Sequence, residues 1–165
     1  MKAHRRSLLL PNAATLVGRH SHPTFSGESS DPWATAGRET IRAMSPDRTE
    51  LTVLIVDDHP SFRAVARMML EIDGFSVVGT AADGESGVAS TLQLAPDVVL
   101  LDVELPDIDG FEVAARLREA GSAAAIVLAS SRERADFGSL VDESGARGFL
   151  TKAELTGDAI RTLVA

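Results

Sequence analysis

Charged and hydroxyl-bearing residues follow the apolar runs of this sequence at the points where buried strands typically end. Asp57 and Asp58 come after the first run, Asp102 after a later one, Ser130 after the next and Lys152 after the last. Carboxylates that are brought together repel one another unless a cation lies between them. A hard divalent ion such as Mg²⁺, held by carboxylates and phosphate oxygens, is the natural partner. With a lysine beside it, such a group suits phosphoryl transfer, with the Asp102 carboxylate as nucleophile.

Each of these residues also has an ordinary structural interpretation. Asp58 is placed to cap a helix that begins near Pro60, and Asp102 could be a turn residue. Ser130 could satisfy a backbone group of a loop, and Lys152 could be a solvated surface residue. The conjunction favours chemistry, because separate strand ends carry the residue types that the same reaction needs. Lys152 is also the only lysine in residues 51–165, which contain eight arginines.

The elements that must position these residues alternate along the chain from residue 51 onward. Continuous apolar runs predict buried parallel strands, and stretches with helical spacing lie between them. The predicted strands are Leu51–Val56, Phe75–Thr80, Asp97–Leu101, Ala124–Leu128 and Gly148–Leu150. The predicted helices are Pro60–Ile72, Glu85–Leu94, Phe111–Ala120, Arg134–Glu143 and Glu154–Val164. This order predicts an α/β fold, a doubly wound five-stranded parallel sheet flanked by helices, with ligands at the carboxyl ends of the strands.

Charge and composition exclude several classes of protein. Residues 51–165 carry a formal charge of −10, which disfavours phosphate backbones and so argues against direct nucleic-acid binding. The chain has no cysteine, so a disulfide framework and a thiolate metal site are excluded. No run of apolar residues is long enough for a membrane helix, and we expect a cytoplasmic protein without membrane contact.

Residues 1–50 differ from the rest and are expected to be a disordered N-terminal extension ahead of a domain at 51–165. They carry a formal charge of +2 and lack a sustained helical or strand period. A second folded domain of this size would need staples such as disulfides, which are absent. We expect residues 1–43 to be dispensable for phosphorylation. Translation from Met44 and a regulatory tail are the two alternative interpretations.

Three motifs resemble those of the response-regulator receiver family, and the resemblance covers about residues 51–165. They are the strand and acidic pair at 53–60, the strand and turn at 100–110, and the last strand with its lysine at 145–152. The resemblance implies a flavodoxin-like fold and a switch in which Asp102 is the phosphoacceptor.

The resemblance also implies roles for the neighbouring residues. Asp58, Asp102 and the backbone carbonyl of Glu104 would bind Mg²⁺ directly, and Asp57 would bind it through a water. Lys152 would pair with a phosphate oxygen, and Phe149 occupies the position of the family's rotameric switch aromatic. The phosphate-sensing hydroxyl is expected at Ser130 when counted back from Lys152, whereas strand register would put Ala129 there. Ala153 departs from the proline that many members have.

The leading hypothesis is a stand-alone receiver, because the sequence ends at about its fifth helix. A sensor histidine kinase or phosphotransfer protein would phosphorylate it, and it would act on an unknown output protein. A homodimer through the last helix and strand is a further expectation. The protein would then be no enzyme beyond its own phosphoryl transfer and dephosphorylation. The alternatives are a phosphate-independent binding module and a Mg²⁺-dependent nuclease or topoisomerase-like enzyme, against which the acidic charge argues.

Overall fold

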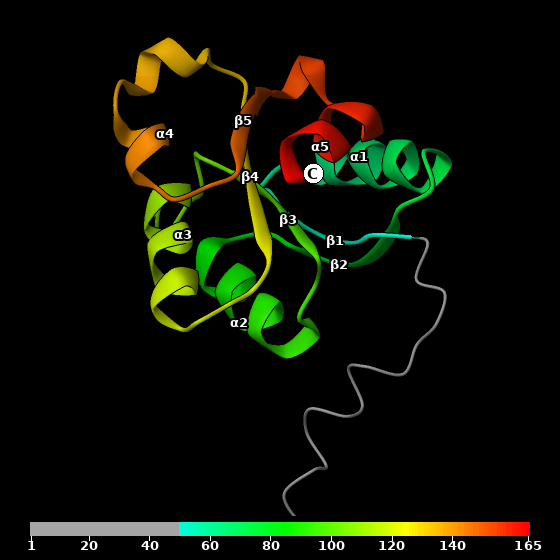
Figure 1. Cartoon of the computed structure of the whole chain (residues 1–165), viewed down its shortest axis with the longest axis horizontal. Helices are drawn as coiled ribbons and strands as arrows, with labels where there is room; N and C mark the ends of the chain where they lie inside the picture. Colours follow the sequence, from blue (N-terminus) through cyan, green and yellow to red (C-terminus); the bar gives the residue numbers. More distant parts are fainter. Residues whose placement is uncertain (1–49) are drawn as a thin grey trace, which may run out of the picture. The chain divides into compact units, whose positions relative to one another are not determined.

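A computed structural model describes residues 50–165, in which five parallel strands form one sheet between two layers of helices (Figure 1). The strands are β1 (Thr52–Val56), β2 (Ser76–Ala81), β3 (Val98–Asp102), β4 (Ala125–Ser130) and β5 (Gly148–Thr151). The α-helices are α1 (Pro60–Ile72), α2 (Gly84–Leu94), α3 (Gly110–Glu119), α4 (Leu140–Glu143) and α5 (Gly157–Val164). Two short 3-10 helices, η1 (Arg134–Phe137) and η2 (Lys152–Glu154), complete the fold.

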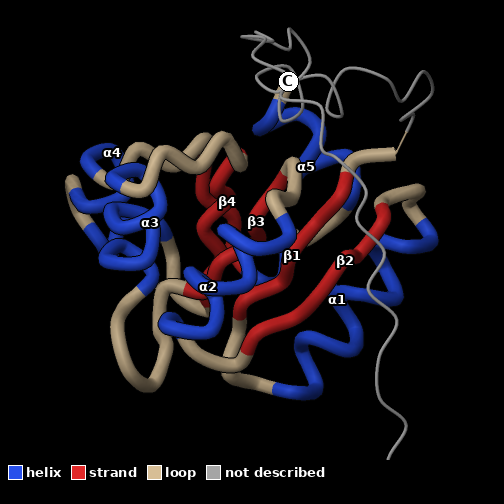
Figure 2. The backbone as a smooth tube through the Cα atoms, turned by 90° about the horizontal axis from the view of Figure 1, so that it is seen from below, coloured by secondary structure: helices blue, strands red, loops and turns tan. Residues whose placement is uncertain are grey.

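The strand order β2-β1-β3-β4-β5 confirms the doubly wound parallel sheet. The described part of the chain enters the sheet at β1, moves outward to β2 and then returns past β1 to β3, β4 and β5. Figure 2 shows the strands with helices on both sides. A crevice at the carboxyl edge of such a sheet lies where the winding direction changes, between β1 and β3.

Two apolar layers hold the helices to the sheet. One face of the sheet packs against α1 and α5 through Ala66, Leu70 and Ile160. The other face packs against α3 through Val113 and Leu117. Strands β1 and β3 are buried along their whole length, which explains why they appear in the sequence as continuous apolar runs.

Local sequence signals fix where most helices begin. Pro60 is the first residue of α1. The Asp83 side chain caps α2 by accepting a hydrogen bond from the N–H of Ser86. The Asp109 side chain caps α3 in the same way, with the N–H of Glu112 as donor. At the start of α3, Gly110 is required by space, because a Cβ there would collide with the backbone of Asp102 and Val103. The loop after β3 is therefore packed closely against the end of that strand.

Two predicted helices differ from the observed elements. The predicted helix Arg134–Glu143 is replaced by η1 and the short α4, which Gly138 separates with φ 56° and ψ −127°. The predicted helix Glu154–Val164 begins only at Gly157, because η2 and an extended Leu155 precede it. The predictions for residues 1–43 and for the boundary of the extension concern residues 1–49, which lie outside the described part of the chain.

Candidate functional site at the carboxyl edge of the sheet

Asp57 and Asp58 lie directly after β1 and differ in burial. The Asp57 side chain is 1% exposed, and its Oδ1 accepts a hydrogen bond of 2.8 Å from the backbone N–H of His59. The Asp58 side chain is 35% exposed and lies 2.5 Å from Nδ1 of His59. One carboxylate of the predicted acidic pair is therefore fixed inside the site, and the other lies at its rim.

Asp102 is the last residue of β3, and its side chain is 2% exposed. Its Oδ1 accepts a hydrogen bond of 3.2 Å from the backbone N–H of Glu104. Burial raises the pKa of Asp102, and the negative charge of Asp57 raises it further. Lys152 and the Glu104 N–H lower it, but the net pKa is still raised. A cation beside this carboxylate therefore favours its ionised form against the effect of burial.

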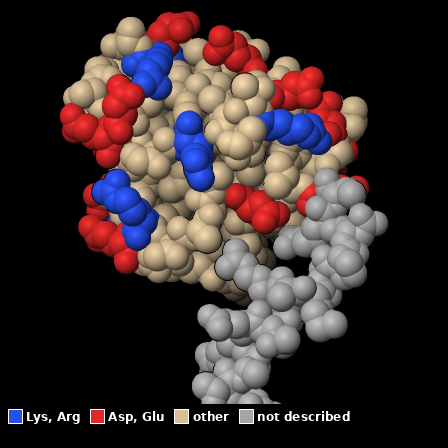
Figure 3. Space-filling view, viewed as in Figure 1, with Lys and Arg blue, Asp and Glu red and all other residues tan. Residues whose placement is uncertain are grey.

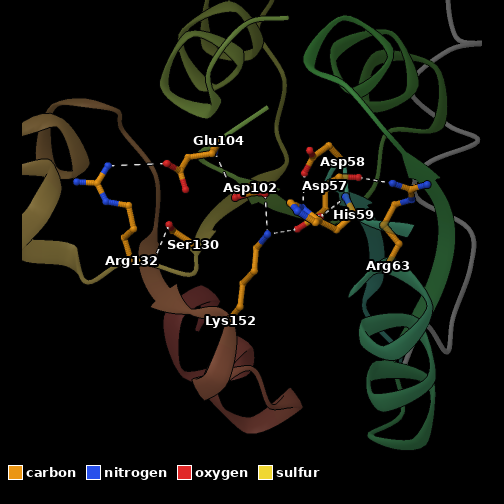
Figure 4. A network of polar contacts seen from close by, with 9 residues as sticks. All are labelled: Asp57, Asp58, His59, Arg63, Asp102, Glu104, Ser130, Arg132 and Lys152. Carbon is orange, nitrogen blue, oxygen red and sulfur yellow. Dashed lines mark hydrogen bonds and ion pairs between the residues drawn. The ribbon is translucent and has the colours of Figure 1, made fainter. Parts of the chain in front are cut away.

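Lys152 supplies that cation from the end of β5. Its Nζ lies 2.7 Å from Oδ2 of Asp102 and 2.6 Å from Oδ2 of Asp57 (Figure 4). It also lies 4.8 Å from the centre of the Phe62 ring, over the ring face. Burial lowers the pKa of Lys152, but the hydrogen bonds and charges of Asp102 and Asp57 outweigh burial, so that the net pKa is raised. The ammonium therefore stays charged between two buried carboxylates.

The acidic group has the donor set of a hard cation site. Donor atoms of Asp57, Asp58, His59 and Asp102 all lie within 4.8 Å of one another. Oδ2 of Asp57 and Oδ1 of Asp58 are buried atoms without a hydrogen bond of good geometry, although Lys152 and His59 lie at ion-pair distance from them. Because buried carboxylate oxygens normally have hydrogen-bond partners, these two oxygens fit a role as ligands of a bound divalent ion.

Ser130 and Ala129 occupy different places at the end of β4. Ala129 pairs in register with Asp102, and its side chain belongs to the apolar core. Ser130 is the last residue of β4 and is fully buried, and its Oγ accepts a hydrogen bond of 3.0 Å from the backbone N–H of Arg132. The hydroxyl is therefore held by the following loop, as Figure 4 also shows.

The loop after β4 forms the opposite rim of the site. Nη1 of Arg132 lies 3.8 Å from Oε1 of Glu104, and its guanidinium lies 5.0 Å from the centre of the Phe137 ring. Phe149 is half-buried on β5 and contacts Phe137 at a centroid distance of 5.7 Å, and Phe137 in turn contacts Phe111 at 5.8 Å. These contacts connect the loop that holds Ser130 to β5.

The structure brings together Asp57, Asp58, Asp102 and Lys152, which the sequence analysis grouped, and it adds neighbours that the analysis did not single out: His59, Arg132 and Phe137. For His59 a signal was available, since a histidine directly follows two acidic residues at a strand end. Arg132 and Phe137 gave no usable signal, because their positions depend on the irregular chain around η1.

Away from this edge, a hollow of about 260 Å³ lies near the start of β4 and is lined by α3 and by the chain before β5. It shares no residue with the acidic group. On the face drawn in Figure 3, the Lys and Arg side chains lie apart from one another, and most of them lie next to acidic ones. Within residues 50–165, no helix is both long and apolar enough to cross a membrane.

Comparison with known proteins places this domain in a family. The family described as the response regulator receiver domain matches residues 53–164. The chain therefore belongs to the response regulator receiver family of two-component systems, and its fold is flavodoxin-like, as the resemblance implied.

Several curated proteins are similar to the chain over this domain. A putative transcriptional regulator of Pseudomonas aeruginosa is 38% identical over 102 residues, which cover 62% of this chain and 49% of that protein. Response regulator GacA of Pseudomonas viridiflava is 34% identical over 114 residues, which cover 68% of this chain and 53% of that protein. The chain thus spans about half the length of these relatives.

Solved structures agree with the fold. The signal receiver domain of the putative response regulator NarL from Mycobacterium tuberculosis superposes with a TM-score of 0.65 at 31% identity, covering 70% of this chain and 96% of that one. A two-component response regulator of the LuxR family from Aurantimonas superposes with a TM-score of 0.63 at 30% identity, covering 70% and 86%.

Proposed function

We propose that this protein is a phosphoacceptor response regulator in which Asp102 takes the phosphoryl group. The observation that carries the proposal is the position of this carboxylate. It is buried at the strand end, faces a lysine ammonium at 2.7 Å, and lies in one group with the carboxylates of Asp57 and Asp58. A nucleophile with a cation and metal ligands around it has the parts that phosphoryl transfer requires.

The phosphoryl donor in this proposal is a phosphohistidine of a sensor histidine kinase or of a phosphotransfer protein. An oxygen of Asp102 attacks phosphorus, the bond between phosphorus and the histidine nitrogen breaks, and the nitrogen keeps the electron pair. The product is an acyl phosphate on Asp102. Lys152, which pairs with the carboxylate before transfer, then pairs with a phosphate oxygen.

The cation in this proposal is Mg²⁺, bound by Asp58, by Asp102 and by the backbone carbonyl of Glu104, with Asp57 acting through a water. When bound, Mg²⁺ neutralises charge on the phosphoryl oxygens. The two buried carboxylate oxygens without good hydrogen bonds support this set, Oδ1 of Asp58 as a direct ligand and Oδ2 of Asp57 as the acceptor of a hydrogen bond from the metal-bound water.

The switch in this proposal starts at Ser130. To bind the new phosphate, its hydroxyl turns toward Asp102 and gives up the N–H of Arg132. Arg132 lies over Phe137, and Phe137 packs on Phe149, so that movement of this loop repacks β5. The changed surface then acts on an output protein through protein contacts, and a homodimer through β5 and α5 is one form such a contact could take.

The experiment that tests this proposal uses acetyl phosphate and Mg²⁺ with three proteins. Wild type and Asp109→Asn should each gain one phosphoryl group that is stable in acid and labile in base. Asp109→Asn is the matched control, because Asp109 lies in the same loop but caps α3. Asp102→Asn should gain none, and uptake equal to that of wild type would show that the assignment is wrong.

A further inference from the structure

His59 has no role in the function proposed above, yet its imidazole is turned toward the acidic group. It is the residue before α1, with extended backbone angles of φ −84° and ψ 109°, and its side chain does not cap the helix. Its Nδ1 lies 2.5 Å from Oδ1 of Asp58 and 3.5 Å from Oδ1 of Asp57. In Figure 4 the ring lies beside both carboxylates.

The oxygen nearest this imidazole, Oδ1 of Asp58, is one of two buried carboxylate oxygens in the group whose polar contacts are incomplete. Oδ1 of Asp58 has no hydrogen bond of good geometry, and neither has Oδ2 of Asp57, whose side chain is 1% exposed. One donor atom from each of Asp57, Asp58, His59 and Asp102 lies within 4.8 Å of the others. The group therefore offers a nitrogen donor beside three carboxylates.

We propose that His59 supplies a nitrogen ligand to the divalent cation of this site. The site then favours transition ions such as Co²⁺, Ni²⁺ and Zn²⁺ over Mg²⁺ more strongly than carboxylates alone would. Imidazole suits these ions, whereas Mg²⁺ prefers oxygen ligands and keeps several waters. The inference rests on the proposed function for the cation site, and it adds which cations that site selects. The His59 side chain is 66% exposed, so the ring has room to move onto a cation.

A plain surface ion pair between His59 and Asp58 is the competing explanation. Exposed pairs of this kind contribute little to stability, and they do not change which metal a neighbouring site prefers. The two explanations therefore differ in one measurable quantity, the ratio of the Co²⁺ affinity to the Mg²⁺ affinity.

The test uses the full chain with His4, His20 and His22 replaced by alanine, so that His59 is the only histidine left. Calorimetric titrations with Co²⁺ and with Mg²⁺ compare this protein with the same protein carrying His59→Asn. Asparagine is a favoured residue before a helix, so the variant should fold. Proton NMR of the Co²⁺-loaded protein adds a direct readout, because a ring N–H proton of a Co²⁺-bound imidazole is shifted far outside the ordinary range.

We expect His59→Asn to weaken Co²⁺ binding by at least about tenfold, since loss even of outer partners of a metal site typically costs about 10–100-fold in affinity. Mg²⁺ binding should change much less, and the shifted ring-proton signal should disappear. An unchanged affinity ratio, or no shifted signal while His59 is present, would overturn the inference.

Phosphorylation with acetyl phosphate and Mg²⁺ separates this inference from the proposed function. If the adduct forms on Asp102 but the affinity ratio is unchanged, the inference about His59 is wrong and the proposed function stands. If the ratio and the ring signal behave as expected but Asp102 takes up no phosphate, the His59 site stands and the proposed function is wrong.

Discussion

Nζ of Lys152 lies 2.7 Å from Oδ2 of Asp102, although fifty residues separate the two in the sequence. The contact joins the carboxyl ends of β3 and β5, two strands that are separated in the sheet by β4. The same ammonium lies 2.6 Å from Asp57, so that one positive charge compensates two buried carboxylates. In the proposed mechanism, this ion pair is the contact that must rearrange when Asp102 becomes phosphorylated.

Replacing Lys152 by alanine should destabilise the domain when Mg²⁺ is absent. Two buried carboxylates then lose their cation, and breaking a buried ion pair typically costs about 3–5 kcal/mol of the free energy of unfolding. Mg²⁺ should recover part of this loss and should bind the variant more tightly than wild type, because the competing ammonium is gone. Urea unfolding with and without Mg²⁺ measures both effects. Equal stabilisation of the two proteins by Mg²⁺ would contradict the assignment of Lys152 to the cation site.

Replacing Gly110 by alanine should disturb the site through the backbone. The new Cβ would collide with the carbonyl oxygen of Asp102, and such overpacking typically costs about 1–3 kcal/mol. We expect lower stability together with slower phosphorylation by acetyl phosphate. Gly138→Ala is the control. A Cβ there would meet nothing within 4 Å, but alanine would be strained by the φ of 56°, so this variant is destabilised by its backbone conformation and not by crowding of the site. It should lose stability without slowing phosphorylation. Equal slowing in both variants would mean that stability alone is being measured.

Ser130→Ala should separate phosphorylation from switching. Asp102 keeps its neighbours in this variant, so phosphate uptake should persist, whereas the hydroxyl that is proposed to bind the phosphate is gone. We expect the amide NMR shifts that beryllofluoride causes in β5 and α5 of wild type to be lost. Ser131→Ala, which changes an exposed neighbouring hydroxyl, should keep them. Full shifts in Ser130→Ala would show that Ser130 is not the switch residue.

The sequence predicted the strands and the group at their carboxyl ends because parallel strands that are buried on both faces leave a direct apolar signature. Once Asp57, Asp102 and Lys152 are assigned to strand ends, the topology of the sheet brings them to one edge. The register of neighbouring strands sets which backbone positions meet at this edge, and the distances between the side chains depend in addition on their rotamers.

The remaining features of the fold and of the candidate site depended on side-chain directions and on irregular backbone, which a residue pattern does not encode. The chain breaks at Gly138 within the predicted helix Arg134–Glu143, and Phe137, just before the break, packs on Phe149. Ser130 bonds to the N–H of Arg132 because the loop bends back at that point. The rotamer that turns His59 toward Asp58 is equally unreadable from the sequence.

Asp107 should make stability depend on pH in the acid range. Its two carboxylate oxygens accept hydrogen bonds from the N–H groups of Glu85 and Gly84 at the start of α2, and these bonds lower the pKa of Asp107 to about 2. Because the folded pKa is lowered, the contribution is present above the unfolded value near 3.8 and is lost as the pH falls toward 2.

Asp107→Asn should therefore be less stable than wild type at neutral pH, and the difference in the free energy of unfolding should shrink below about pH 4. Urea unfolding between pH 7 and pH 3 measures this difference. Glu133→Gln, which changes an exposed acidic side chain, should follow wild type throughout. A difference that stays constant with pH would show that the charge of Asp107 does not matter.

The most direct measurement locates the phosphoryl group itself. After phosphorylation with acetyl phosphate and Mg²⁺, borohydride reduces the acyl phosphate and converts the modified aspartate into homoserine, which tandem mass spectrometry of peptides assigns to one residue. The account predicts homoserine at position 102 and unmodified aspartate at positions 57, 58, 107 and 109. Homoserine at any of those four positions, or phosphate uptake with position 102 unchanged, would contradict it.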